Sequence, residues 1–189
     1  DVGDDAIVFS TVVTSGVYDL GVGADQVTLN NGTAANAITV SNVESFTGSS
    51  AADSVTFGTA IASGTVNLGA GADSLTLGNG TNVLTVTSAE SMTGNAGADT
   101  ITLSGAMTAG TFDLLGGSDQ LNLASGTNTI TATNIESIVG GTGNDTVTLG
   151  TGTSLGSIDL GSGTDSLNLS AGGGTYTVQG TEAITGGAG

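Results

Sequence analysis

The sequence contains no lysine, arginine or histidine, so every charged side chain in it is acidic. Its 17 Asp and Glu residues give a formal net charge of -17 at pH 7. Nucleic-acid binding by phosphate neutralisation needs Lys or Arg and is therefore excluded. Anionic membrane surfaces are disfavoured for the same reason, and the partners that such a chain attracts are cations.

Cysteine and proline are also absent. Without cysteine there is no disulfide, no thiol catalysis and no zinc–thiolate site, so the chain must be stabilised by other means, of which bound metal is common. The lack of proline agrees with interior strands that each donate their N–H groups to a ladder. No apolar run approaches the ~18 residues that span a bilayer, so we expect no direct membrane insertion. The chain starts at Asp1 with no visible signal peptide, and we interpret it as a mature or excised piece.

Aromatic residues are scarce, with four Phe and two Tyr, which predicts a narrow aliphatic core. Acidic chains are often disordered because they are poor in apolar residues. Here 37% of the residues are hydrophobic, which is enough for a core. We therefore expect an ordered protein.

Four series of polar residues repeat along the chain in one register, with a spacing of 46 residues that widens to 48 once in three of the series. The series are Asp5, Asp53, Asp99 and Asp145; Asp25, Asp73, Asp119 and Asp165; Glu44, Glu90, Glu136 and Glu182; and Asp19, Asn67, Asp113 and Asp159. We interpret residues 1–189 as one continuous repeat array, with copies at approximately 3–49, 50–95, 96–141 and 142–189. Because no capping segment is evident, we expect a longer parent array.

Within a copy, apolar and polar residues alternate with the period of two that is typical of half-buried strands. In the second copy the apolar positions are Val55/Phe57, Val66/Leu68, Leu75/Leu77, Leu84/Val86 and Met92. This spacing gives five strand-plus-turn units per copy, each of about nine residues and too short to bury its apolar face alone. The sequence therefore predicts an all-β fold, a parallel β-solenoid (β-roll or β-helix) of stacked coils with two or three sides. A string of small sandwich domains, each made from a pair of copies, is the alternative.

The segment Gly140–Thr148 matches the nonapeptide G-G-x-G-x-D-x-U-x, and looser matches precede Asp25, Asp73, Asp99 and Asp165. It resembles the RTX (repeats-in-toxin, haemolysin-type) calcium-binding repeats, in the style of bacterial surface-layer and adhesin proteins. The resemblance implies a β-roll with Ca²⁺ in the turns, held by Asp carboxylates and turn carbonyls. The implied metal ligands are Asp25, Asp73, Asp119, Asp165, Asp99, Asp145, Asp5 and Asp53, with turn carbonyls near Gly23, Gly71, Gly117, Gly163, Gly97 and Gly143.

Two departures from that pattern change the expected number of sites. Asp53 is the weakest candidate, because the glycine two residues before it has been replaced. The Gly–Asp turns also recur after 20 and then 26 residues, and once after 28, rather than in every unit. We therefore expect fewer ions than in a true roll. The 34 glycines are interpreted as tight corners that need positive φ.

If the coil has two sides, Asp53, Asp73 and Glu90 stack on one edge, and Asp99, Asp119 and Glu136 stack on the other. Carboxylates ~5 Å apart repel each other by roughly 1 kcal/mol in water and more in a drier site. Only a metal, a proton or wide solvation relieves this repulsion, and Ca²⁺ suits hard oxygen ligands. Alternatively, these acids are solvated turn residues. For the Glu series we favour turn capping or solvent exposure, and for the Asp19 series an outward-facing position on the strands.

The favoured function is an extracellular scaffold, secreted or on a bacterial cell surface: a surface layer, adhesin stalk or filament, rigidified by Ca²⁺ and contacting itself or neighbouring repeats. An ice-binding module is a second possibility, because outward Thr residues could form a regular grid. The two Thr series are Thr28, Thr56, Thr76, Thr102 and Thr148; and Thr39, Thr85, Thr131 and Thr177. A polysaccharide-acting β-helix enzyme is disfavoured, because no basic residue can stabilise developing negative charge. We therefore expect no catalysis.

Overall fold

Each short apolar run forms a strand in the computed structural model, which describes residues 2–151 and 155–187. One sheet contains β1 (Ala6–Val8), β3 (Gln26–Thr28), β5 (Ser45–Ser49), β7 (Gly64–Gly69), β9 (Val83–Thr87), β11 (Thr100–Leu103), β13 (Gln120–Asn122), β15 (Ser137–Val139), β17 (Leu155–Asp159) and β19 (Thr175–Gln179). The other contains β2 (Val17–Asp19), β4 (Ala37–Ser41), β6 (Ser54–Phe57), β8 (Ser74–Thr76), β10 (Ser91–Ala96), β12 (Gly110–Gly116), β14 (Thr129–Thr133), β16 (Thr146–Leu149), β18 (Ser166–Asn168) and β20 (Ala183–Thr185).

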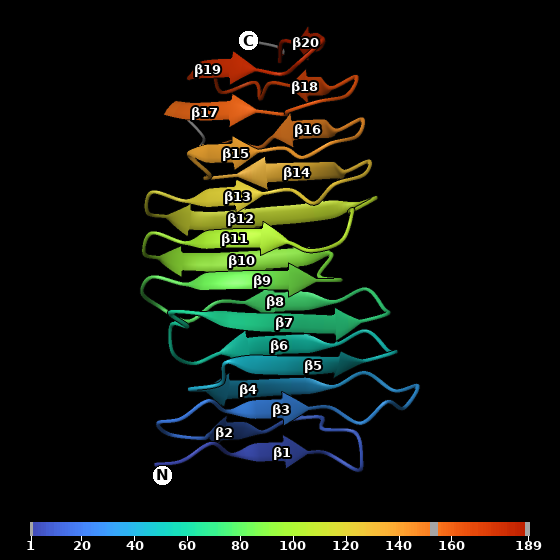
Figure 1. The fold of residues 1–189 in the computed structure, drawn as a ribbon, viewed down its shortest axis with the longest axis vertical. Helices are drawn as coiled ribbons and strands as arrows, with labels where there is room; N and C mark the ends of the chain where they lie inside the picture. Colours follow the sequence, from blue (N-terminus) through green and yellow to red (C-terminus); the bar gives the residue numbers. More distant parts are fainter. Residues whose placement is uncertain (1, 152–154, 188–189) are drawn as a thin grey trace.

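Consecutive strands lie in opposite sheets, so the chain winds as a two-sided coil (Figure 1). Every strand pairs in parallel with the strands one coil before and after it, as in the register Val55↔Leu75 between β6 and β8. The fold is therefore the predicted parallel β-solenoid. The sandwich alternative is wrong, because both sheets run through all four copies with parallel neighbours only. At ~4.8 Å per strand, ten strands in each sheet make a rod about 45–50 Å long.

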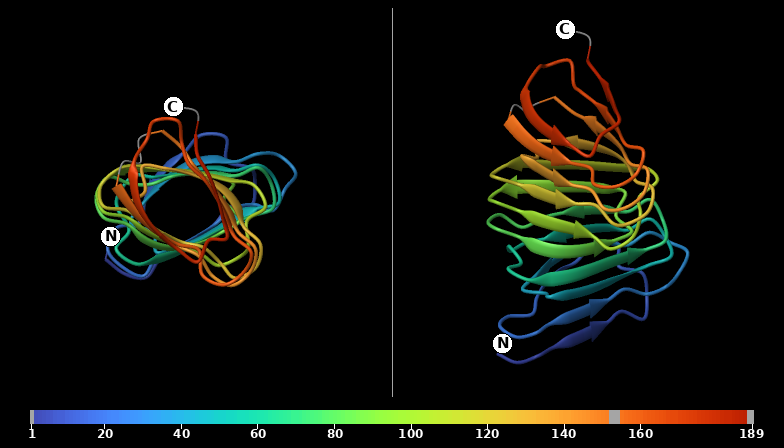
Figure 2. Two further views of the ribbon diagram at one scale, coloured as in Figure 1. Left: turned by 90° about the horizontal axis from the view of Figure 1, so that it is seen from above. Right: turned by 45° about the horizontal axis from the view of Figure 1, so that its top comes forward.

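Seen along its axis, the rod is a flattened ring in which successive coils superpose and turn gradually about the axis (Figure 2). This rotation is the ordinary consequence of strand twist. No helix among the described residues is long and apolar enough to cross a membrane. Residue 1, which precedes the predicted first copy, and residues 152–154 and 188–189 of the predicted fourth copy lie outside the described part of the chain.

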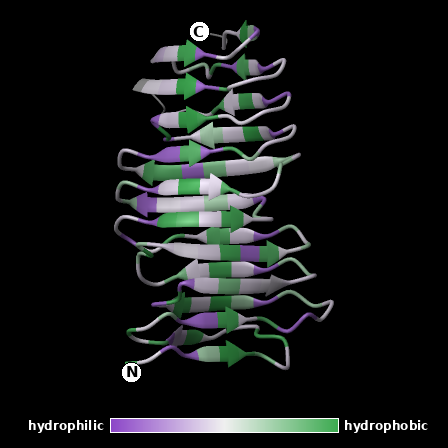
Figure 3. Ribbon diagram, viewed as in Figure 1, coloured by the Kyte–Doolittle hydropathy of each residue, from purple (hydrophilic) through white to green (hydrophobic). Residues whose placement is uncertain are grey.

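The core is a thin aliphatic layer between the two sheets. In the middle coils the strand residues alternate between buried apolar and exposed or half-buried polar side chains, whereas in β1, β2, β19 and β20 the apolar residues are only half-buried or exposed. Figure 3 shows the matching variation in hydropathy along the ribbons. All of the apolar positions predicted for the second copy are buried, including Leu68, Leu75 and Met92. Phe46 and Phe57, from facing sheets, meet edge to face with ring centroids 6.2 Å apart. Each fully buried aliphatic side chain contributes ~1.5–3 kcal/mol, so stacking is the main source of stability.

Five strands per copy is an odd number, and this sets where equivalent residues lie. Asp53 precedes β6 in one sheet, whereas its equivalent Asp99 precedes β11 in the other. The same position therefore alternates between the two edges of the rod from one copy to the next. Along a single edge the pattern repeats only after two copies, which is five coils.

Candidate functional site

The inward acids form hydrogen-bonded ladders along the edges of the rod. Each of them directly precedes a strand, and each except Asp5 in the first coil accepts a hydrogen bond from the backbone N–H of the corresponding residue one coil earlier. The Asp53 N–H donates to Asp73 Oδ1 at 2.6 Å, and the Asp73 N–H donates to Glu90 Oε2 at 2.8 Å. The predicted stacking of these three acids on one edge is confirmed.

The opposite edge repeats this arrangement one copy later. The Asp99 N–H donates to Asp119 Oδ1 at 2.7 Å, and the Asp119 N–H donates to Glu136 Oε2 at 2.8 Å. These acids precede β11, β13 and β15, which lie in the other sheet, so the predicted change of edge is also confirmed. Each Glu side chain thus caps a backbone N–H group, but this N–H belongs to the preceding coil and not to the turn of the Glu itself.

Asparagines complete the ladders, and sequence reasoning missed them. Both the backbone N–H and the Nδ2 of Asn82 donate to Asp99 Oδ1, at 2.8 and 2.9 Å, while its Oδ1 accepts the Ile61 N–H at 3.0 Å. Asn36 and Asn128 make the equivalent contacts with Asp53 and Asp145. The available signal was their 46-residue spacing at a position just before a strand. In the fourth copy this position is Gly174.

Six of the ladder aspartates are at most 1% exposed, and the Oδ2 atom of each has no hydrogen-bond partner. They are Asp25, Asp73, Asp99, Asp119, Asp145 and Asp165. Burial raises the pKa of Asp73 and of Asp119 to about 6, and the nearby acids of each ladder add to the effect. Burial also raises the pKa of Asp99, despite the hydrogen bonds from Asn82. A buried carboxylate oxygen without a partner is costly unless a proton or a cation neutralises it.

Glycines beside these aspartates bring carbonyl oxygens close to the carboxylates. A Cβ on Gly23 would lie 2.0 Å from the carbonyl oxygen of Gly3, one coil earlier, and 2.9 Å from Asp25 Oδ1. Gly117 has the same surroundings, with the Gly97 oxygen at 2.1 Å and Asp119 Oδ1 at 2.8 Å. Only glycine fits there, because the backbones of adjacent turns touch. The predicted reason, positive φ, applies to Gly21, Gly69 and Gly161 in the same turns, and also to Gly71 at 154° and Gly143 at 126°.

Two features therefore test whether Ca²⁺ fits: a buried carboxylate oxygen without a partner, and a glycine cradle that collects a carboxylate and a carbonyl oxygen. The turns of Asp25, Asp73, Asp119 and Asp165 have both. Asp99 and Asp145 have the unpartnered oxygen and a carbonyl packed on the nearby glycine, Gly97 or Gly143. Asp5 is half-buried, and Asp53 has both oxygens bonded within the chain.

All of these donors are hard oxygens, which are the ligands that Ca²⁺ takes in proteins. No group of three or more acidic side chains in the described residues comes close enough to hold a metal ion. An ion in these turns would therefore combine one or two carboxylates with backbone carbonyls, and it would neutralise the buried charge. The donor set fits calcium.

The outward series lies on strands, at the last residue of β2 and β17 and inside β7 and β12, and each member lies at a local turn of the backbone. The Asp113 Oδ1 accepts the N–H of Leu115 at 3.1 Å, and Asn67 Oδ1 accepts the N–H of Gly69 at 3.1 Å. Such turns need an oxygen acceptor but no charge, which explains how asparagine serves at one of the four positions. The residue two positions on has positive φ in every copy, including Leu115 at 64°. The predicted outward orientation is confirmed, since these side chains are exposed or half-buried.

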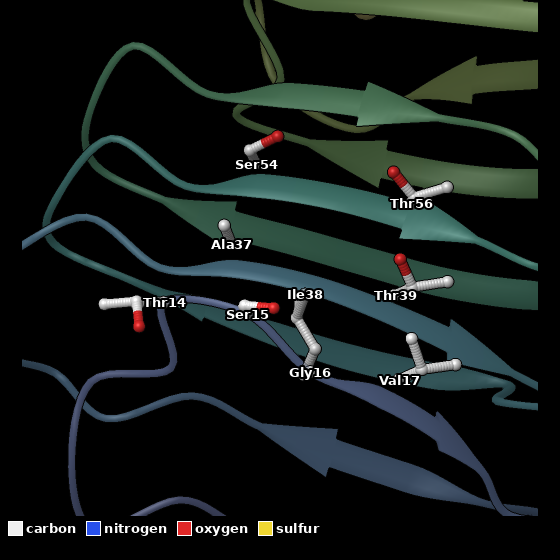
Figure 4. Close-up of a pocket in the computed structure, with 9 residues that line it drawn as sticks. All are labelled: Thr14, Ser15, Gly16, Val17, Ala37, Ile38, Thr39, Ser54 and Thr56. Carbon is white, nitrogen blue, oxygen red and sulfur yellow. The ribbon is translucent and has the colours of Figure 1, made fainter.

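The two predicted Thr series do not each form one grid, because each is divided between the two sheets. Thr28 lies in β3 of one sheet, whereas Thr56 and Thr76 lie in β6 and β8 of the other. The longest Thr column in the β2-containing sheet is instead Thr39–Thr56–Thr76–Thr93, and it ends at Asp113. A shallow hollow at the start of this column is lined by residues 14–16, just before β2, and by small hydroxyl and apolar residues of β2, β4 and β6, with no acid among them (Figure 4).

Comparisons of this chain with protein-family models, with curated proteins and with solved structures find no match. The fold and the ladder geometry therefore carry the functional argument.

Proposed function

We propose that this protein is an extracellular structural scaffold, part of a surface layer, an adhesin stalk or a secreted filament, whose coils are made rigid by Ca²⁺ at the Gly–Asp turns. The observation that carries the proposal is the set of six buried carboxylate oxygens without a partner, in a chain that has no basic residue. Nothing within the sequence neutralises them. An external cation would neutralise these carboxylates, and binding it would require only one or two turns to be held in a fixed conformation.

The solenoid supports the scaffold role. Each coil contacts only its neighbours, so length and stiffness grow with the number of copies, as in other solenoids. The polar groups of the chain recur in every copy instead of converging once, which is the arrangement of a spacer and not of a catalytic centre. Neighbouring repeats of the same kind are the partners that such a rod would meet.

The donor set also fixes the expected affinity. Calcium sites with few carboxylates bind with dissociation constants on the order of 10⁻⁴–10⁻³ M, the range of extracellular modules. Such sites stay empty in the cytosol and fill after export, so the rod would become rigid only outside the cell. The proposed localisation follows from this argument and from the resemblance to secreted repeats.

Calcium titration of the purified chain tests the proposal. Isothermal titration calorimetry should give several ions per chain, and thermal unfolding followed by circular dichroism should shift upward with CaCl₂ and downward with EGTA. Equal MgCl₂ is the control, because Mg²⁺ dehydrates reluctantly and prefers fewer protein ligands. Solution scattering should show a rod in CaCl₂. Unchanged unfolding in EGTA would remove calcium from the proposal, and a flexible or compact particle in CaCl₂ would remove the scaffold.

A further inference from the structure

The turn formed by residues 48–53, between β5 and β6, differs from all the other Gly–Asp turns. Both carboxylate oxygens of Asp53 are bonded within the chain. The Ser49 N–H donates to Oδ2 at 2.7 Å, and the Ser49 hydroxyl donates to Oδ1 at 3.0 Å. Ser49 is 4% exposed, so these bonds are shielded from water. The unpartnered oxygen found at six other turns is thus absent here.

The glycine cradle is missing from the same turn. Ala51 stands where the equivalent turns have Gly97 and Gly143. A Cβ on those glycines would lie 2.3 and 2.5 Å from the carbonyl oxygens of Gly80 and Gly126, so their turns are packed directly on the preceding coil. Ala51 carries a Cβ, and its N–H donates to the Ser49 hydroxyl at 3.1 Å. Within this turn, Ser49 is therefore hydrogen-bonded both to the Asp53 carboxylate and to the Ala51 N–H.

The equivalents of Ser49 in the next two copies do not close their turns. Asn95 occupies this position in the third copy, and its side-chain amide donates to the Leu77 carbonyl instead. Gly141 occupies it in the fourth copy and has no side chain to offer. In both copies the Oδ2 atom of the following aspartate, Asp99 or Asp145, has no partner, so the backbone N–H that bonds Asp53 Oδ2 from Ser49 does not reach it there. The group that these two turns lack is the Ser49 hydroxyl, which donates to Asp53 Oδ1 and accepts the Ala51 N–H.

We infer that Ser49 takes the place of the bound ion at residues 48–53, so that this part of the rod stays ordered without calcium while the turns at residues 94–99 and 140–145 depend on it. The inference rests on the proposed calcium function for its second half only. The rod then has a permanently ordered section around β5 and β6, from which the calcium-dependent coils extend.

Hydrogen exchange of the whole chain, read by mass spectrometry in CaCl₂ and in EGTA, tests this inference on three equivalent segments: residues 45–57, 91–103 and 137–149. Moving from CaCl₂ to EGTA should speed exchange about tenfold or more in the second and third segments and less than about twofold in the first. Equal acceleration in all three segments would overturn the inference and leave the calcium proposal standing.

A second arm keeps the two proposals apart. In EGTA, Ser49→Ala should speed exchange in residues 45–57 about tenfold, whereas the neighbouring Ser50→Ala, whose side chain is exposed, should leave it unchanged. If calcium changes hydrogen exchange in none of the segments, but residues 45–57 still exchange most slowly and Ser49→Ala still speeds their exchange, the calcium proposal fails. The inference that Ser49 closes the turn at residues 48–53 would then still stand. If Ser49→Ala speeds exchange in residues 45–57 no more than Ser50→Ala does, the inference that Ser49 closes this turn fails.

Discussion

Two sets of aspartates repeat through this chain at the same interval and face opposite sides of its coils. The outward set lies on the strands and consists of Asp19, Asp113 and Asp159, with Asn67 in the second copy. The inward set precedes the strands, and all eight of its members are Asp. The outward carboxylates are exposed or half-buried and accept a local backbone N–H, and Asp19 and Asp113 also accept the side-chain amide of an asparagine one coil later. The inward ones accept backbone N–H groups of the adjacent coil inside the protein.

The difference shows where charge itself matters. An amide oxygen caps a local turn as well as a carboxylate does, which is why Asn67 is sufficient outside. An amide is also sufficient inside, because Asn36, Asn82 and Asn128 hold the same ladders. The chain nevertheless keeps Asp at eight inward positions, where burial makes a charge most expensive. The proposed divalent cation would account for the charge at the six of these positions whose Oδ2 atom has no partner.

The largest contrast is expected from deleting one member of each set. Asp119→Ala leaves the buried N–H of Asp99 without an acceptor and opens a gap in the ladder. It should lower the free energy of unfolding by about 2–4 kcal/mol in urea denaturation. Asp113→Ala, six residues earlier, loses the bonds from the Leu115 N–H and from Asn134 Nδ2 at a half-buried position and should cost only about 0.5–1.5 kcal/mol. Equal costs would mean that the ladders do not hold the coils together.

Low pH should raise the free energy of unfolding of the calcium-free rod, because it protonates buried aspartates of the inward set. The pKa of Asp73 and of Asp119 is raised from 3.8 to about 6 in the folded state, mainly by burial. Between those values the folded chain binds more protons than the unfolded chain, so the free energy of unfolding falls as pH rises from about 4 to about 6. Thermal unfolding in EGTA should therefore occur several degrees higher at pH 4 than at pH 7. A rise in stability over that interval would contradict the burial of these groups.

Replacing an aspartate by asparagine removes its charge but keeps an oxygen acceptor, so this substitution tests whether the charge matters in the inward set and not in the outward set. Asp119→Asn retains Oδ1 for the Asp99 N–H but removes the charge, so in EGTA it should unfold at or above the temperature of the unaltered chain. At calcium ten times above the dissociation constant, the variant should lose the ~1.4 kcal/mol that one filled site contributes. Asp113→Asn should respond to calcium as the unaltered chain does. An unchanged calcium response in Asp119→Asn would exclude Asp119 as a ligand.

The smallest effect is expected in the outward turns. Leu115 has φ of 64°, a conformation that costs a side-chain-bearing residue ~1–2 kcal/mol, and the equivalent residues in the other copies are glycines. Leu115→Gly should raise the free energy of unfolding by about 0.5–1 kcal/mol once the entropy of glycine is counted. Leu115→Asn should have a free energy of unfolding between those of the unaltered chain and of Leu115→Gly. Destabilisation by glycine would show that the half-exposed leucine side chain contributes more than the backbone loses.

Most of the fold was predictable because it depends on short-range patterns that recur. The period of two placed Leu75 and Met92 in the core, and the 46-residue register placed Asp53, Asp73 and Glu90 on one edge once two sides were assumed. The Asn82 contacts were not predictable in the same way, since a turn asparagine reads as a local feature until its partner Asp99, 17 residues later, is known to lie directly beside it. The division of the Thr series between the sheets follows from the odd number of strands per copy.

The sequence by itself determined the class of fold, the repeat and the sign of every charge, because alternation and composition act locally and need no knowledge of neighbours. Only the tertiary structure decided which oxygen atoms are left without a partner. That depends on local contacts: the same Gly–Asp signal produces a closed carboxylate at Asp53, where the Ser49 N–H and hydroxyl both donate to it, and an open one at Asp99, where the equivalent Asn95 donates its side-chain amide to the Leu77 carbonyl instead.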